Sequence, residues 1–238
     1  NVLWFANNKE DAHEEPTIKR SRSHDYVSKE VINVRENVGL IEVANFSKHE
    51  FKGPDARKFL DHIMAGRLPK PGRISLSPML SYRGKLCGDL TVACLDENEF
   101  MVFGSGAAQE MHRRWFESHL DKFNLSYSNR SDEYHGLSIA GPNSRKVLEK
   151  IVRDDVSNEK FKFRDSRRMF VGGVPAIINR ISFTGELGYE IYVAPHYQLK
   201  LYEELMEAGK EFNIKPFGGR ALMSMRLEKN WGAWTLDY

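Results

Sequence analysis

The chain has 238 residues, enough to bury a large core as one domain or as two closely packed ones. Its 35 basic and 33 acidic residues leave a formal charge of +2, and 41% of the residues are hydrophobic. This balance is typical of an ordinary globular protein and argues against a nucleic-acid binder that relies on a basic surface. Because no apolar run approaches the roughly 18 residues that span a bilayer, we expect no membrane partner either.

The first 35 residues are polar and predict an irregular lead-in that ends in a helix around residues 26–36. The chain starts at Asn1 without a Met, as the middle of a longer polypeptide would, so targeting cannot be judged from this end. Cys87 and Cys94 are seven residues apart, and an odd separation on one strand points side chains to opposite faces. We therefore expect free thiols and an intracellular location, either the cytoplasm or, in a eukaryote, the mitochondrial matrix.

A short sequence motif occurs twice, at residues 53–63 and 141–151. Each copy begins with Gly-Pro, follows a strand-like run and carries apolar residues at helical spacing, so each predicts a helix with Pro at its first position. Because the copies lie about ninety residues apart, they indicate a duplicated strand–helix unit and not a short-period solenoid. We expect a lead-in over residues 1–35 and two pseudo-repeated subdomains at about residues 36–130 and 131–238.

Around the two copies, strand-like runs alternate with two further helical patterns. Strands are expected at residues 39–43, 49–52, 73–79, 89–94, 99–103, 168–171, 174–183 and 188–193, and the helices at 107–120 and 196–208. Hairpin-like links between strands, with helices interspersed, predict an α+β fold built on antiparallel sheets. The chain stops at Tyr238 with no cap or turn, so we expect the natural domain to continue beyond it.

Asp89 opens an otherwise apolar, β-favouring run. Strand interiors disfavour Asp, so a carboxylate at this position needs a reason. One interpretation is structural, with the side chain bonding the preceding turn at residues 82–85. The other interpretation is that the carboxylate takes part in chemistry.

Glu190 lies within the apolar strand predicted at residues 188–193. Gly185 and Gly188 are explained by a tight reversal between two strands, but the glutamate is not. A buried carboxylate requires a partner, so Glu190 is a candidate binding group.

Arg220 falls in the first turn of a helix that opens at residues 218–219. A cation at this end opposes the helix dipole and suggests an anionic or acceptor-rich partner, although a salt bridge with a nearby acid explains it equally well. Glu190 and Arg220 together would suit a heterocycle with donor and acceptor edges, because both side chains hydrogen-bond in a bidentate manner. Further along the helix, Arg226, Glu228 and Lys229 are interpreted as ion-pairing residues.

Three stretches, at residues 182–190, 218–222 and 226–234, resemble in order the signatures of the aminomethyltransferase (glycine cleavage T-protein) family. The last of them, Arg-Leu-Glu-Lys-Asn-Trp-Gly-Ala-Trp, is most similar to the tetrahydrofolate-binding C-terminal part of dimethylglycine and sarcosine dehydrogenases. The resemblance covers nearly the whole chain. It implies duplicated antiparallel-sheet and helix units of the folate-binding fold, without the family's C-terminal barrel.

The resemblance also implies roles for six residues. Asp89 takes the place of the catalytic acid that faces the reactive folate nitrogens. The implied cofactor-binding residues are Glu190, Arg220, Tyr192, Phe183 and Trp234.

The chain departs from the family pattern at several positions, and Trp234 for one stands where the T-protein branch has a cofactor-facing tyrosine. Phe183 replaces a common tyrosine, Leu76 stands where a tyrosine often precedes the catalytic acid, and Gly88 replaces the first of two tandem acids. The change at Phe183 puts any polar contact there in doubt, the change at Leu76 predicts a different pocket polarity, and Gly88 leaves a single carboxylate.

The implied function is tetrahydrofolate-dependent capture of a one-carbon unit from an N-methylated amine of the dimethylglycine or sarcosine type, giving 5,10-methylenetetrahydrofolate. The chain carries no dinucleotide fingerprint, so FAD would belong to an oxidase domain or subunit outside it. We expect no metal site, because the histidines lack ligand spacing. Two alternatives stay open: a non-catalytic folate-binding or regulatory module, and a T-protein-like aminomethyltransferase that works with a lipoyl carrier protein.

Overall fold

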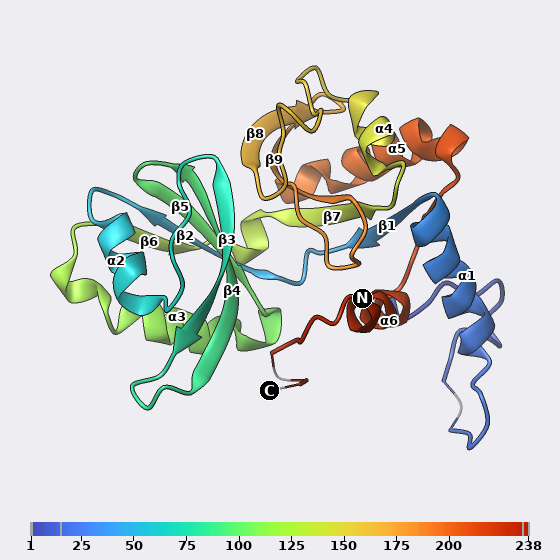
Figure 1. Cartoon of the computed structure of the whole chain (residues 1–238), viewed down its shortest axis with the longest axis horizontal. Coiled ribbons are helices and arrows are strands. Elements are labelled where there is room, and N and C mark those ends of the chain that lie inside the picture. Colours follow the sequence, from blue (N-terminus) through green and yellow to red (C-terminus); the bar gives the residue numbers. More distant parts are fainter. Residues whose placement is uncertain (1, 15, 235, 238) are drawn as a thin grey trace.

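Two β-sheets form the centre of the molecule, with helices covering their outer faces (Figure 1). The computed structural model describes residues 2–14, 16–234, 236 and 237. The first sheet has the order β3 (Arg73–Leu80), β4 (Leu86–Asp96), β5 (Glu99–Gly104), β2 (Ser47–Lys52) and β6 (Ser126–Asn129). The second has the order β11 (Ile214–Pro216), β1 (Val38–Glu42), β7 (His135–Ala140), β10 (Gly188–Val193), β9 (Val174–Asn179) and β8 (Ser166–Val171). Only the β1–β11 pair among these strands is parallel, so the predicted α+β class with antiparallel sheets is confirmed.

Six α-helices and several short 3₁₀ turns complete the described part of the chain. The helices are α1 (Ser23–Glu36), α2 (Ala56–Ile63), α3 (Gln109–Glu117), α4 (Ser144–Glu149), α5 (Gln198–Gly209) and α6 (Gly219–Glu228). The 3₁₀ turns are η1 (Gly106–Ala108), η2 (Leu120–Lys122), η3 (Ser131–Glu133), η4 (Pro195–Tyr197) and η5 (Lys210–Phe212). Among the described residues, no helix has both the length and the apolar character needed to cross a membrane.

The repeated sequence motif has the same backbone conformation in both copies. Gly53 and Gly141 have φ values of 137° and 135°, a region that side chains rarely allow. A Cβ atom at Gly141 would also lie 2.5 Å from the carbonyl oxygen of Asn37. The expectation that Pro occupies the first helical position is wrong, because the Gly-Pro-Asx segment forms a turn and the helices begin two residues later, at Ala56 and Ser144.

Strand β1 does not join the sheet formed by the residues that follow it. It pairs with β7 and β11, so the first sheet takes only residues 47–129. We propose the two sheets with their helices as the subdomains expected near residues 36–130 and 131–238, with β1 exchanged into the second.

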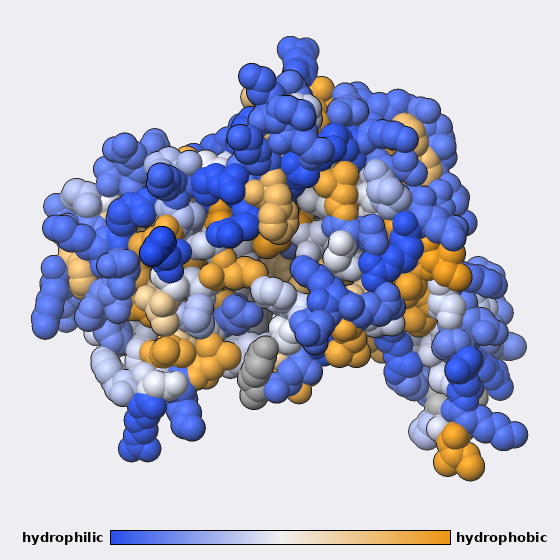
Figure 2. Space-filling model, in the orientation of Figure 1, coloured by the Kyte–Doolittle hydropathy of each residue, from blue (hydrophilic) through white to orange (hydrophobic). Residues whose placement is uncertain are grey.

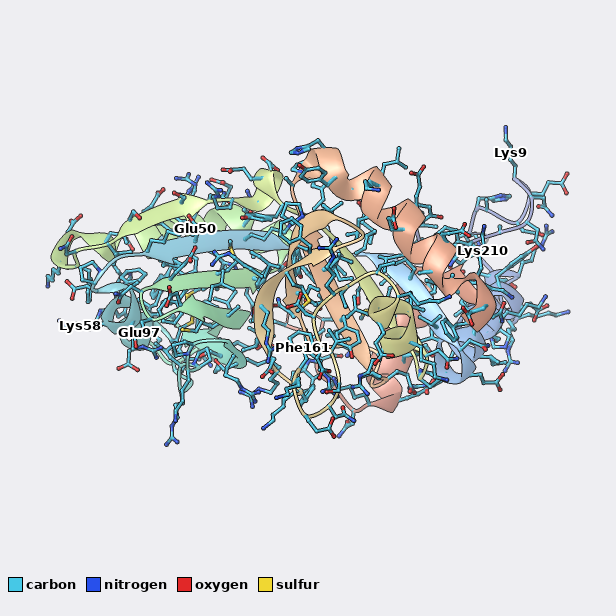
Figure 3. The ribbon with its side chains drawn as sticks, turned by 90° about the horizontal axis from the view of Figure 1, so that it is seen from above. Lys9, Glu50, Lys58, Glu97, Phe161 and Lys210 are labelled. Carbon is cyan, nitrogen blue, oxygen red and sulfur yellow. The ribbon has the colours of Figure 1, made fainter. Side chains whose placement is uncertain are left out.

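Hydrophobic side chains fill three spaces: beneath α2 and α3, beneath α4 and α5, and between the two sheets. In the third space the rings of Phe103 and Tyr192 stack with centroids 4.5 Å apart. Figure 3 shows the two halves side by side, with Glu50 in the first and Phe161 and Lys210 in the second. The apolar contact between the sheets holds them together as one body.

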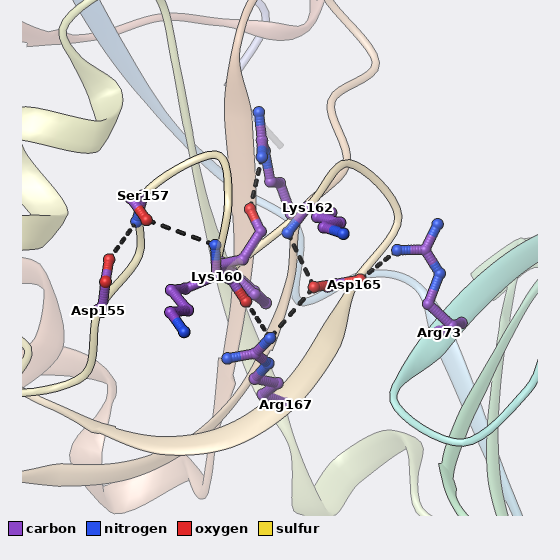
Figure 4. A network of polar contacts seen from close by, with 9 residues as sticks. Arg73, Asp155, Ser157, Lys160, Lys162, Asp165 and Arg167 are labelled. Carbon is purple, nitrogen blue, oxygen red and sulfur yellow. Dashed lines mark hydrogen bonds and ion pairs between the residues drawn. The ribbon is translucent and has the colours of Figure 1, made fainter.

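Polar contacts at the edge of this junction fix the sheets relative to each other. Asp165, just before β8, pairs with Arg73 at the start of β3 and also accepts a hydrogen bond from the backbone N–H of Lys162 at 2.8 Å (Figure 4). Arg168 on β8 donates to both carboxylate oxygens of Glu99 on β5, at 2.9 and 2.6 Å. These ion pairs fix the two sheets relative to each other, so that side chains of β4 and β10 face the same space between the sheets.

Candidate functional site

A cavity of about 600 Å³ lies where the two sheets meet. Figure 2 shows apolar side chains gathered near the middle of this face, between the two halves. The walls come from β3, β4, β5 and β10, the segment after β1, the η1 turn, the residues before β8, the loop before β10, and the segment after α6. Lining side chains that enter the argument below are Leu76, Asp89, Phe103, Phe183, Glu190, Lys229, Trp231 and Trp234.

Glu190 reaches the cavity from the middle of β10. Its Oε2 accepts a hydrogen bond from the hydroxyl of Tyr192 at 2.9 Å, because residues two apart on a strand share a face. Burial raises the pKa of the Glu190 carboxyl to about 7, and the Tyr192 hydrogen bond partly opposes that rise. The Glu190 carboxyl therefore changes charge near neutral pH, while the hydrogen bond from Tyr192 fixes its orientation.

Tyr192 itself is fully buried and does not line the cavity. Burial raises the pKa of its hydroxyl well above the usual value, so the group stays protonated and acts as a donor. The implied contact between Tyr192 and a ligand is not what the structure shows, because the ring is packed against Phe103. Tyr192 instead supports the Glu190 carboxylate from behind.

Asp89 enters the cavity from β4, in the other sheet. It is half-buried, and this burial raises the pKa of its carboxyl. The preceding turn is closed by Ser81, whose N–H donates to the Lys85 carbonyl at 2.8 Å and whose hydroxyl accepts from the Lys85 N–H at 3.2 Å. No hydrogen bond reaches the Asp89 carboxylate from the described part of the chain, so the turn-bonding interpretation is wrong.

Arg220 lies at the start of α6, as expected, but does not face the cavity. Its guanidinium donates to the Ser23 hydroxyl at 3.0 Å, pairs with Glu14 and lies 5.1 Å from the ring centroid of Trp4. The prediction that Arg220 and Glu190 converge on one cavity is therefore wrong, and the salt-bridge alternative is confirmed. The N-terminal segment crosses this end of α6, where the Arg220 N–H donates to the Leu3 carbonyl at 3.0 Å, and so draws the side chain away.

Phe183 and Trp234 both line the cavity and give it aromatic walls. Phe183 comes from the loop before β10, and Trp234 from the segment that runs from α6 toward the first sheet (Figure 1). The Trp234 ring stacks on His112 of α3, with centroids 5.5 Å apart and planes at 25°. Leu76, where the family often has a tyrosine, also lines the cavity and makes that wall apolar.

Lys229 lines the cavity, a role that the sequence did not indicate. Its Nζ donates to the Ser182 carbonyl at 3.1 Å and lies 5.0 Å from the ring centroid of Trp231, and burial lowers its pKa. The expected ion pairs along α6 are wrong in detail, since Glu228 pairs with Arg35 of α1 and Arg226 with Asp237. The aromatic residues that follow Lys229 in the sequence were the available sign that it borders an aromatic wall.

Comparison with known proteins assigns the chain to a family. The sequence model of the GCVT N-terminal domain matches residues 1–238. The chain belongs to the GCVT N-terminal domain family. Mitochondrial dimethylglycine dehydrogenase from Mus musculus is 36% identical to this GCVT N-terminal domain over 97% of the chain, which covers 27% of that protein.

Two further relatives connect this GCVT N-terminal domain to other members. Sarcosine oxidase subunit alpha from Rhizobium meliloti is 34% identical, covering 85% of the chain and 21% of that protein. An aminomethyltransferase from Thermoanaerobacter pseudethanolicus is 30% identical, covering 82% of the chain and 53% of that protein. The chain thus spans about a quarter of the dehydrogenase and about half of the aminomethyltransferase.

Solved structures confirm the fold of the domain. Glycine cleavage system aminomethyltransferase T from Bartonella henselae superposes with a TM-score of 0.78 at 23% identity, over 87% of this chain and 55% of that one. A chain of the heterotetrameric sarcosine oxidase from Corynebacterium sp. U-96 superposes with a TM-score of 0.60 at 18% identity, over 82% of this chain and 97% of that one. The predicted aminomethyltransferase fold is confirmed.

Proposed function

We propose that this domain binds tetrahydrofolate in the cavity and transfers a one-carbon unit to it. The unit is captured from an N-methylated amine of the dimethylglycine or sarcosine type, and the product is 5,10-methylenetetrahydrofolate. The observation that carries the proposal is the pair of acids, Glu190 and Asp89, which enter one aromatic-walled cavity from opposite sheets. The 36% identity to mouse dimethylglycine dehydrogenase over nearly the whole chain supports this choice of amine.

The residues present fit a folate. A pterin is flat and has N–H donors along one edge, and the Glu190 carboxylate is an acceptor already held in one direction by Tyr192. Phe183 and Trp234 supply apolar aromatic surface for flat rings. A volume of about 600 Å³ falls within the range of roughly 300–1,000 Å³ usual for small-molecule sites.

Bound tetrahydrofolate would supply the nitrogen atoms that accept the one-carbon unit. The protein's own contribution then falls to Asp89, whose carboxylate has no competing hydrogen bond from the described residues. It stabilises positive charge that develops on the ligand and accepts or returns a proton at one of its nitrogens. Such assistance typically contributes about 10²–10⁴-fold to a rate.

Titration of the intact chain with tetrahydrofolate tests the binding half of the proposal. Glu190→Ala is expected to raise the dissociation constant by about 10–100-fold, because hydrogen bonds to a charged partner contribute about 1.5–3 kcal/mol. Glu186→Ala is the matched control, since Glu186 lies in the same hairpin but pairs with Arg35 at 2.6 Å. Equal affinities for the Glu190 and Glu186 variants would remove the pterin-binding role.

A second candidate is an aminomethyltransferase that works with a lipoyl carrier protein, which the 30% identity to the Thermoanaerobacter enzyme supports. Ammonia release from an aminomethylated lipoyl carrier in the presence of tetrahydrofolate identifies this activity. Tetrahydrofolate binding without either turnover identifies a non-catalytic folate-binding module.

An FAD-dependent oxidase domain or subunit outside this chain is part of the main proposal. Its support is that the mouse dehydrogenase is covered over only 27% of its length. The same relative is named as mitochondrial, which supports the matrix as the location if the protein is eukaryotic.

A further inference from the structure

His112 is a fully buried histidine on α3, and the proposed function leaves it without a role. Its ring lies behind the cavity and contacts both β4, which carries the proposed catalytic acid, and Trp234, a proposed binding residue. The Nε2 atom is 3.1 Å from the carbonyl oxygen of Cys87, two residues before Asp89 on β4. The ring face stacks on Trp234, a wall of the cavity.

The protonation state of His112 follows from these contacts. A carbonyl oxygen only accepts, so Nε2 carries the hydrogen and donates it to Cys87. Burial lowers the pKa of the ring, which is therefore neutral, with Nδ1 unprotonated and without a hydrogen bond from the described residues. Exchange of the two ring positions would leave the Cys87 carbonyl facing a lone pair, so a single tautomer is selected.

Gly88 shows how closely β4 packs against the same ring. A Cβ atom at Gly88 would lie 2.9 Å from His112 Nε2, closer than real Cβ contacts come. In the family pattern the first of two tandem acids stands at this position, directly before Asp89. The imidazole occupies the space which that side chain would need, so His112 explains why a single carboxylate is present here.

We propose that His112 is a positioning residue, one that fixes β4 at Asp89 through its Nε2–H and fixes the Trp234 wall through its ring face. The inference rests on the proposed function, because Asp89 and Trp234 matter as parts of the folate site. Its two contacts are chemically different, and this allows them to be separated by substitution.

Two substitutions each retain one contact. His112→Gln keeps an N–H donor near the Nε2 position but loses the aromatic face, whereas His112→Phe keeps the face and loses the donor. Turnover is measured as methylenetetrahydrofolate formation from formaldehyde above the uncatalysed rate, and binding as tetrahydrofolate affinity. His119→Phe is the control, since His119 follows α3 and contacts Tyr82 at 2.7 Å, outside the cavity.

His112→Phe is expected to lower kcat by about 10-fold, with the tetrahydrofolate dissociation constant changed less than about 2-fold, because small misplacements of a catalytic group are costly. His112→Gln is expected to raise the dissociation constant by about 3–10-fold with kcat retained, as the loss of one aromatic contact predicts. Equal losses of kcat and affinity in both variants, or none in either, would overturn the inference, since a merely structural role does not split the two quantities.

A measurement without ligand separates failure of this inference from failure of the proposed function. Gly88→Ala is expected to lower the urea midpoint of unfolding strongly in the His112 chain and by less than half as much in a His112→Ala background. Additive shifts would contradict the contact between β4 and the imidazole.

If the unmodified chain binds no tetrahydrofolate and shows no turnover, the proposed function fails and the positioning role falls with it. If the unmodified chain binds and turns over normally but the two His112 variants lose kcat and affinity equally, the proposed function stands and only the role of His112 is rejected.

Discussion

Glu190 and Asp89 enter one cavity from different sheets, but the protein holds them differently. The Glu190 carboxylate on β10 is held by the buried Tyr192 hydroxyl at 2.9 Å. The Asp89 carboxylate on β4 has no hydrogen bond from the described residues, although burial raises the pKa of both acids. A carboxylate fixed in direction suits recognition of a ring edge, and one without a partner suits proton transfer and charge stabilisation.

The largest effect is expected at Asp89. Asp89→Asn keeps the shape of the side chain but removes its charge and its capacity to take a proton, so kcat should fall by about 10²–10³-fold. Tetrahydrofolate affinity should change by less than about 3-fold, if this end serves chemistry and not recognition. Methylenetetrahydrofolate formation at an unchanged rate would end the assignment of Asp89 as the catalytic acid.

The next effect concerns the pH dependence of binding through Glu190. Its pKa of about 7 means that the carboxylate is lost as the pH falls below neutrality, so affinity should decrease by up to about tenfold per pH unit there. Above about pH 8 the affinity should be constant. Glu190→Gln has no charge to lose, so its weaker binding should show no change between pH 6 and 8 in the same titrations.

Tyr192→Phe should have a smaller effect, because it leaves both acids in place. Loss of the hydroxyl removes the hydrogen bond that opposes the rise of the Glu190 pKa, so the midpoint of the binding pH profile should move upward. At pH 7 the affinity should fall by about 3–10-fold, and kcat should stay within about 2-fold. A profile identical to that of the unmodified chain would show that Tyr192 does not tune this carboxylate.

Arg220→Ala should have the smallest effect on ligand binding, with tetrahydrofolate affinity changed by less than about 2-fold. The guanidinium is occupied by Glu14, Ser23 and Trp4, away from the cavity. The free energy of unfolding should fall by about 1 kcal/mol, since the side chain makes a partly exposed ion pair and one aromatic contact. A large loss of affinity would restore the acid–arginine couple that the sequence suggested.

Several parts of this site were predictable because they depend on local sequence. Asp89 and Glu190 are charged residues in apolar strands, and their need for a reason is visible without coordinates. Most of the strands and helices follow from periodicity, and the Gly-Pro repeat predicted two matching helices, although each begins two residues later than expected. The family signatures added the folate hypothesis to residues that the pattern had already singled out.

Contacts between distant segments were not predictable in this way. Arg220 has the same first-turn position in either interpretation, and only the path of the N-terminal segment across α6 decides that its partner is Glu14. Lys229 resembles an ordinary surface residue at the end of a helix until folding brings the Ser182 carbonyl to its Nζ. His112 shows no ligand spacing in the sequence, yet it lies against both β4 and Trp234.

By itself, the sequence determined the α+β class, the duplicated strand–helix segment and the two acids that line the cavity. Only the tertiary structure decided that Tyr192 supports Glu190, that Arg220 lies outside the cavity and that β1 crosses into the second sheet. The reason is physical: backbone preference and apolar periodicity act over a few residues, whereas hydrogen-bond and packing partners depend on how segments far apart in the sequence come together.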